Sequence, residues 1–189
     1  PLGSHSHMGT SADTDRRIAD LIPPAAAIPT PDDGSISSRT FANPRANVSA
    51  TRTRGWRAAE IPAANGHGNA RSIVRAQTPM ANGGSAFGKT IMSEAGVRRI
   101  FDRQSGGEDL VLGGPIVFGM GYGLSTSDFP LGPNERIAYW GGYGGSTVVV
   151  DQDARLCLSY VMNRMEGGLL GDRRHPFDRR ADLLRQKVS

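Results

Sequence analysis

Three short segments in the C-terminal half of the chain constrain its fold more than any other feature. Residues 136–142 (RIAYWGG), 146–151 (STVVVD) and 154–164 (ARLCLSYVMNR) have the length and the β-branched and aromatic content of strands. The last two are joined by a tight turn that begins at Asp151, whose side chain can bond its own backbone. Successive strands with such short connections predict an antiparallel sheet.

Helices are predicted before and after these strands. Asn69 is a suitable N-cap for a helix that ends near Pro79, and Ser93 is a suitable N-cap for a second helix. The apolar stripe of the second helix is formed by Val97, Ile100 and Phe101. Two more helices are expected near the ends of the chain, over residues 13–21 and 175–187. Helices followed by an antiparallel meander predict the α+β class, with an antiparallel sheet flanked by helices.

The chain of 189 residues is long enough for one domain with a substantial core. Residues 1–8 (PLGSHSHM) have the composition of a protease-site and vector remnant, so they are left out of the expected fold. Residues 9–55 are expected to be an irregular, Pro- and Ser-rich segment with a short N-terminal helix, on the surface or packed on something else. Residues 56–189 are expected to hold the helices, the antiparallel sheet and a C-terminal helix.

Composition argues against several classes of function. The net charge of +4 comes almost entirely from arginines scattered among acidic residues, without the basic stripe and interleaved aromatics of a nucleic-acid surface. No apolar run is long enough to cross a bilayer. Beyond residues 1–8 the only histidines are His67 and His175, so we expect no metal site and no other cofactor.

The single cysteine, Cys157, rules out an internal disulfide framework and favours a reducing compartment, so we expect a bacterial cytoplasmic protein. It lies in the alternating run RLCLSYV, which predicts a buried structural thiol. A reactive thiol is the alternative.

Residues 83–90 (GGSAFGKT) match the phosphate-binding pattern G-x-x-x-x-G-K-[ST] letter for letter, and residues 147–151 (TVVVD) resemble the strand that ends in a magnesium-binding Asp in nucleotide hydrolases. A phosphate loop needs a strand before its glycines and a helix that begins at the Lys-Thr pair. Here a helix broken at Pro79 precedes the glycines, and the next helix begins only after Ser93. We therefore interpret residues 83–90 as a connector between two helices with a solvated Lys89, and nucleotide binding is a distant alternative.

Several stretches in a fixed order resemble the serine β-lactamase-like, penicillin-recognising hydrolases, and in particular their carboxylesterase branch. They are residues 60–73 (EIPAANGHGNARSI), 118–124 (FGMGYGL) and 138–165 (AYWGGYGGSTVVVDQDARLCLSYVMNRM). The resemblance extends from about Asp13 to Leu184 and concerns the C-terminal portion of the family. It implies a β-lactamase-like fold and ester hydrolysis through an acyl-enzyme, with a small ester or amide as substrate.

The resemblance also implies roles for individual residues. Trp140 would line an acyl pocket, Gly141 and Gly142 would let the substrate lie along the backbone, and the N–H of Tyr143 would point at the developing oxyanion. His67, in a loop flanked by glycines, is a candidate substrate contact. The alternatives are a core aromatic at Trp140, close packing or a bulge at the glycines, and a local backbone hydrogen bond for His67.

Two motifs of the family's mechanism are missing from this sequence. The family's nucleophile lies in Ser-x-x-Lys and its second base in Tyr-x-Asn. Ala86 stands three residues before Lys89, Leu184 stands three residues before Lys187, and no tyrosine has Asn two residues later. We therefore expect a chain that begins after both motifs and has no acyl-transfer activity by itself. The second hypothesis is a non-catalytic segment that folds with a partner chain or self-associates, because half of a sheet leaves strand edges uncovered.

Overall fold

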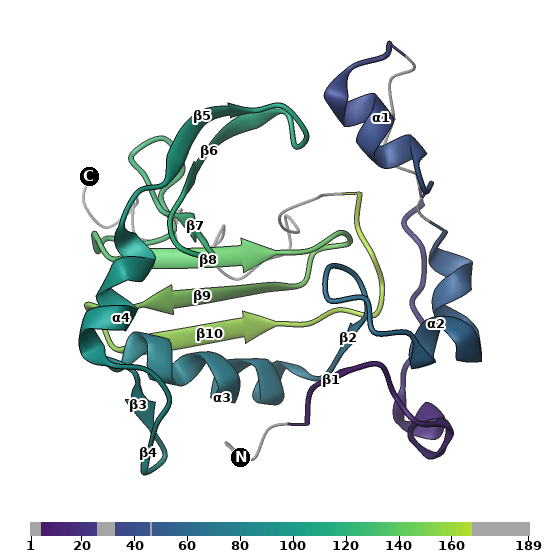
Figure 1. Cartoon of the computed structure of the whole chain (residues 1–189), viewed down its shortest axis with the longest axis horizontal. Coiled ribbons are helices and arrows are strands. Elements are labelled where there is room, and N and C mark those ends of the chain that lie inside the picture. The colour runs from purple at the N-terminus through teal and green to yellow at the C-terminus, as the bar shows by residue number, and fades with distance from the viewer. Residues whose placement is uncertain (1–4, 26–32, 46, 168–189) are drawn as a thin grey trace.

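The computed structural model describes residues 5–25, 33–45 and 47–167. Its centre is a six-stranded antiparallel sheet in the order β10-β9-β8-β7-β6-β5 (Figure 1). The strands are β5 (Ser105–Asp109), β6 (Gly114–Phe118), β7 (Gly123–Leu124), β8 (Ile137–Gly141), β9 (Thr147–Asp151) and β10 (Leu156–Tyr160). The predicted α+β class, an antiparallel sheet flanked by helices, is confirmed.

Strands β8, β9 and β10 form where the three β-rich segments predict them. Their register aligns Tyr139 with Val149 and Val149 with Leu158, which puts these three side chains on one face of the sheet. Asp151 closes the turn between β9 and β10, because its Oδ1 accepts a hydrogen bond from the N–H of Ala154 over 2.8 Å. The antiparallel hairpin is confirmed, so the TVVVD run does not belong to a parallel sheet.

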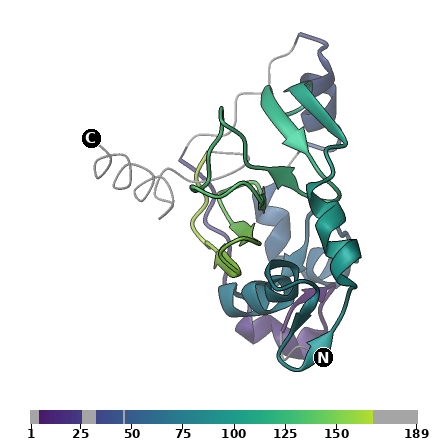
Figure 2. The ribbon, with the colours of Figure 1, turned by 90° about the vertical axis from the view of Figure 1, so that its left-hand side faces the viewer.

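The sheet buries a different set of apolar side chains on each face, because successive residues of a strand point to opposite sides. On one face, helices cover Ala138 and Val150 (Figures 1 and 2). The helical side of this cluster consists of Met80, Ala81, Val97 and Ile100. The opposite face holds Ile137, Tyr139 and Val149 against Leu131. Full burial of each valine or isoleucine stabilises the fold by about 1.5–3 kcal/mol.

Cys157 on β10 packs against the cluster under the helices and is partly buried. Burial raises the pKa of its thiol to about 12. The thiol is therefore protonated at neutral pH and a poor nucleophile, which agrees with the predicted structural role.

Helix α3 (Ala70–Ala81) begins as predicted at Asn69, whose side chain accepts a hydrogen bond from the N–H of Ser72 over 2.9 Å. It continues two residues past Pro79, where the sequence predicts its end. The proline ring is almost fully buried, and it lies in the last turn, where it removes only one helical hydrogen bond. Tertiary packing therefore outweighs the local signal to stop.

Helix α4 (Glu94–Arg98) is capped by Ser93, as predicted, and tightens into a 3₁₀ turn, η3 (Arg99–Phe101). Between α3 and α4 the chain forms a small hairpin of β3 (Ser85–Ala86) and β4 (Lys89–Thr90) (Figure 1). The phosphate-loop letters thus lie in a hairpin with exposed Lys89, which supplies neither the strand nor the helix that phosphate binding requires.

The N-terminal segment contains more structure than its composition predicts. Its elements are β1 (His7–Met8), η1 (Ala12–Arg17), α1 (Ile36–Ala42), η2 (Val48–Arg52) and α2 (Arg54–Ala58). Strand β1, within the residues left out of the expected fold, pairs with β2 (Gly66–His67). Helix α1 is not predicted, since its seven residues are too few to show a hydrophobic period.

Ion pairs tie this segment together. The nearly buried guanidinium of Arg57 lies 3.0 Å from Asp20 and 3.9 Å from Asp15. Arg54 pairs with the same Asp15 and also donates to the backbone of Thr10. Removing one member of such a partly buried network leaves its partners uncompensated, so these contacts fix where residues 10–20 lie.

One strand at the edge of the sheet differs from the sequence prediction, and one predicted helix is not tested. Strand β5 has the sequence SGGED, which carries none of the β-branched residues that predict a strand, and it forms by pairing with β6. The helix predicted over residues 175–187 lies outside the described residues.

Candidate active site

A cleft of about 1110 Å³ lies between the N-terminal segment and the end of the sheet where β8 and β9 are joined. Its lining comes mainly from residues 17–21, 63–70 and 161–163, together with Gly142 and Tyr143. These segments are far apart in the sequence, so the cleft exists only in the folded chain.

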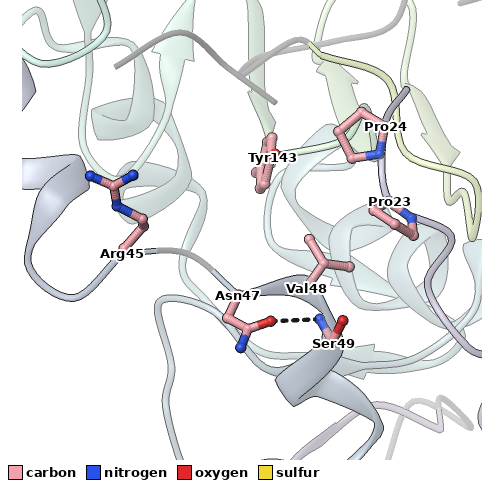
Figure 3. Close-up of a pocket in the computed structure, with 7 residues that line it drawn as sticks. All are labelled: Pro23, Pro24, Arg45, Asn47, Val48, Ser49 and Tyr143. Atoms are coloured by element: carbon pink, nitrogen blue, oxygen red, sulfur yellow. Dashed lines mark hydrogen bonds between the residues drawn. The ribbon is translucent and has the colours of Figure 1, made fainter. Parts of the chain in front are cut away.

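A second hollow of about 500 Å³ adjoins the cleft (Figure 3). It is lined by Pro23, Pro24, Arg45, Asn47, Val48, Ser49 and Tyr143. Four of these residues also line the larger cleft: Arg45, Asn47, Val48 and Tyr143. Tyr143 therefore stands where the two hollows meet.

Tyr143 occupies the second position of the β-turn that joins β8 to β9. The N–H of Gly145 donates to the carbonyl of Gly142 over 3.1 Å, and Gly144, at the third position, has φ of 99°. A positive φ at this position is typical of a type II turn and requires glycine. The N–H of the second residue points out of such a turn, and that of Tyr143 has no acceptor among the described residues.

The glycines of this turn are there for different reasons. Gly144 has a positive φ, and a Cβ there would also lie 2.7 Å from Met162 and 2.8 Å from Met165, so both the turn and close packing require this glycine. A Cβ at Gly142 would meet nothing within 4 Å. Gly142 lines the larger cleft, and the space beside it is open.

Trp140 and Gly141 line neither hollow. The ring of Trp140 lies 5.6 Å from that of Phe118, centroid to centroid, and 38% of Trp140 is exposed. Trp140 is thus a partly exposed aromatic residue on the sheet. Only Gly141 separates it from Gly142, which lines the larger cleft.

His67 lines the larger cleft on β2. Burial lowers the pKa of its imidazole, and the charges of Arg57 and Arg54 act in the same direction, while the backbone of Asn65 opposes them. Its Nδ1 is buried without a hydrogen-bond partner. The ring is therefore neutral at neutral pH, and it has one unpartnered nitrogen besides its hydrogen bond to the backbone of Asn65.

Asn65 builds the loop that carries His67, and sequence reasoning missed it. Its Oδ1 accepts from the N–H of Ile61 over 3.0 Å, and its Nδ2 donates to the carbonyls of Trp56 and Ala59. The side chain is 2% exposed. The only sequence signal was an Asn next to Gly66 in a turn-forming stretch, which says nothing about burial.

In the part of the chain that the structure describes, no helix has both the length and the apolar character to cross a bilayer. The same residues contain no group of three or more His, Cys, Asp or Glu side chains arranged to hold a metal ion.

Known proteins resemble this chain in sequence and in structure. A family model described as Beta-lactamase matches residues 4–183. The crystal structure of a family VIII carboxylesterase is 30% identical with a TM-score of 0.81, over 100% of this chain and 49% of that chain. A novel penicillin-binding protein homolog from Caulobacter crescentus is 32% identical with a TM-score of 0.77, over 91% of this chain and 46% of that chain.

EstA from Arthrobacter nitroguajacolicus Rue61a shares the fold, with 21% identity and a TM-score of 0.79 over 100% of this chain and 51% of that chain. A search of curated proteins found no match. The chain spans about half the length of the solved structures it matches. The family model covers nearly the whole sequence, and the resemblance read from the Trp-Gly-Gly region is confirmed: the chain belongs to the beta-lactamase family.

Proposed function

We propose that this chain forms one wall of the active site of a serine hydrolase that cleaves small esters or amides, and that the N–H of Tyr143 stabilises the oxyanion. The observation that carries the proposal is this N–H group, which has no acceptor among the described residues and belongs to a residue lining both hollows. Ester hydrolysis passes through a tetrahedral intermediate with a negatively charged oxygen. One preorganised donor to that oxygen contributes about 10²–10³ in kcat.

The nucleophile and base are proposed to come from polypeptide outside this sequence, which contains neither Ser-x-x-Lys nor Tyr-x-Asn. A serine would attack the ester carbonyl, the alcohol would leave, and water would then release the acid from the acyl-enzyme. The neighbour named a family VIII carboxylesterase supports this reaction class. By itself the chain is proposed to be inactive.

The remaining predicted residues are proposed to contact the substrate. Gly142 leaves open space where a side chain would obstruct a ligand lying along the backbone. Trp140 presents an exposed ring beside Gly141 and is proposed to bound the acyl group. His67 lines the larger cleft and is proposed to contact the substrate there.

The test measures hydrolysis of p-nitrophenyl acetate. We expect no activity above background for this chain, and activity when it is joined to a segment of the carboxylesterase that carries Ser-x-x-Lys and Tyr-x-Asn. In the joined protein, Tyr143→Pro should lower kcat by about 10²–10³ because it removes the N–H. Proline is favoured at the second position of a type II turn, so the backbone should keep its shape.

Tyr143→Ala is the matched control, because it deletes the phenol but keeps the N–H. Equal losses of kcat for Tyr143→Pro and Tyr143→Ala, with both variants folded by circular dichroism, would contradict the oxyanion role. Hydrolysis by the present chain alone would contradict the proposed absence of a nucleophile.

A second candidate is a segment that works by association with a partner chain or with itself. Strand β10 ends the described sheet, and two large apolar residues are exposed on it or just after it, Leu156 at 49% and Val161 at 38%. An uncovered strand edge with apolar side chains favours pairing with another chain. Light scattering after size-exclusion chromatography tests this candidate, since a concentration-independent monomer would count against self-association.

A further inference from the structure

Two arginines line the larger cleft, Arg17 and Arg45, and of these only Arg45 also lines the smaller hollow. Arg52, Arg54 and Arg57 pair with Asp15 or Asp20. Arg45 lines both hollows and makes no ion pair with any described residue. Among the described residues, no carboxylate neutralises its charge.

The smaller hollow combines this charge with the apolar side chains of Pro23, Pro24 and Val48 and with the polar residues Asn47 and Ser49, which are hydrogen-bonded to each other. Figure 3 shows Arg45 on one side of the hollow and Tyr143, Val48, Pro23 and Pro24 together on the other side. No carboxylate is among the described residues that line it. A guanidinium beside apolar walls suits a ligand with a carboxylate at one end and a methylene chain behind it.

The larger cleft does not offset the charge of Arg45. Of its described lining residues only Asp20 carries a carboxylate, and that group lies 3.0 Å from Arg57 and 3.7 Å from Arg52. The charge of the described residues at the junction of the two hollows is therefore positive, which favours anionic substrates.

We propose that the smaller hollow selects esters whose acyl part ends in a carboxylate, that is, half-esters of dicarboxylic acids. Arg45 holds the free carboxylate, the prolines and Val48 contact the methylene chain, and the ester carbonyl lies at the Tyr143 N–H. Hydrolysis with one water breaks the acyl C–O bond and releases the alcohol and the dicarboxylic acid. This assignment rests on the function proposed above, which supplies the ester site at Tyr143.

The test follows binding of monomethyl glutarate and of the neutral dimethyl glutarate to the purified chain by ¹H–¹⁵N NMR. We expect monomethyl glutarate to shift the backbone amide of Tyr143 and the Nε–H of Arg45. Dimethyl glutarate should shift the Tyr143 amide with about fivefold weaker affinity, the size expected for one exposed charge pair. Higher salt should reduce that preference.

Arg45→Gln should make the two affinities equal, and Arg45→Lys should keep part of the preference because it retains the charge without the planar fork. Arg39→Gln is the matched control, since Arg39 is an exposed arginine of α1 that lines neither hollow. It should keep the full preference.

The outcomes separate this inference from the proposed function. Equal affinities in the unaltered chain, or an unchanged preference in Arg45→Gln, would overturn the role of Arg45 and leave the ester site at Tyr143 standing. If monomethyl glutarate binds through Arg45 without shifting the Tyr143 amide, both the half-ester assignment and the proposed oxyanion site are overturned. Binding of neither compound overturns both as well.

Discussion

Residues 83–90, the hairpin between helices α3 and α4, and residues 142–145, the turn between strands β8 and β9, are both glycine-rich connections, and they use glycine differently. In the hairpin, Gly84 has φ of 95°, and a Cβ there would lie 1.9 Å from the carbonyl oxygen of Met92. In the turn, a Cβ at Gly142 would meet nothing within 4 Å. Gly84 fits a crowded backbone, whereas Gly142 borders an empty cleft.

The two connections also differ in what their polar groups contact. In the hairpin, Ser85 and Thr90 are hydrogen-bonded to each other through their hydroxyls over 2.7 Å. The two residues between the strands, Phe87 and Gly88, have φ of 53° and 71°, as in a type I′ turn. In the turn, the N–H of Tyr143 has no acceptor among the described residues. In the hairpin the two hydroxyl groups bond each other, whereas in the turn a backbone donor that lines the cleft has no acceptor among the described residues.

The substitution with the largest expected effect on stability is Gly84→Ala, which tests whether packing requires the glycine of the hairpin. We expect a loss of about 2–4 kcal/mol in the free energy of unfolding, because alanine must adopt a left-handed backbone and clashes with fixed backbone atoms. Urea unfolding followed by circular dichroism measures it. A change below about 0.5 kcal/mol would show that Gly84 is not required by packing.

A smaller effect on the free energy of unfolding is expected from the protonation of His67, which lines the larger cleft. Its folded pKa is lowered, chiefly by burial, so protonation favours the unfolded chain. Stability should be fully present above the unfolded value of about 6.5 and should fall as pH drops below it. The unfolding free energy, measured from pH 8 to pH 5, should depend less on pH in His67→Gln. Parallel curves for the two proteins would rule out this contribution.

Gly142→Ala is the matched partner of Gly84→Ala. We expect a change within about 0.5 kcal/mol in the free energy of unfolding, because the new methyl group enters open space. The same urea experiment applies. A loss as large as that of Gly84→Ala would erase the distinction between the two connections.

The smallest expected effect is that of Lys89→Ala. Lys89 is exposed on β4, so its removal should alter stability by less than about 0.5 kcal/mol. ATP with magnesium should not raise the melting temperature of either protein. Stabilisation by ATP that disappears in Lys89→Ala would restore the nucleotide-binding alternative.

Local signals were sufficient for much of the fold. Asn69 and Ser93 mark the helix starts because a capping side chain bonds an N–H only three residues away. The acidic turn at Asp151 closes the last hairpin by the same kind of short-range bond. The extension of α3 past Pro79 was missed, since the burial of that ring depends on the core against which it packs.

The site was predicted less completely than the fold. The Trp-Gly-Gly resemblance led to the family and to Tyr143, which lines both hollows. The contact of Trp140 with Phe118 and the buried hydrogen bonds of Asn65 had no sequence signal that distinguished them. Both involve partners whose identity depends on how the chain is folded.

By itself the sequence determined the antiparallel strands, the capped helices and the family, because periodicity, capping and motif order are properties of neighbouring residues. Only the tertiary structure decided that Arg45, His67 and Tyr143 line one connected cleft. That cleft is formed by segments that ion pairs such as Arg57 with Asp20 hold together across 37 residues of chain. From the sequence, any of several acidic residues could pair with any of several arginines. The burial and geometry that select the actual pairs arise only when the chain folds.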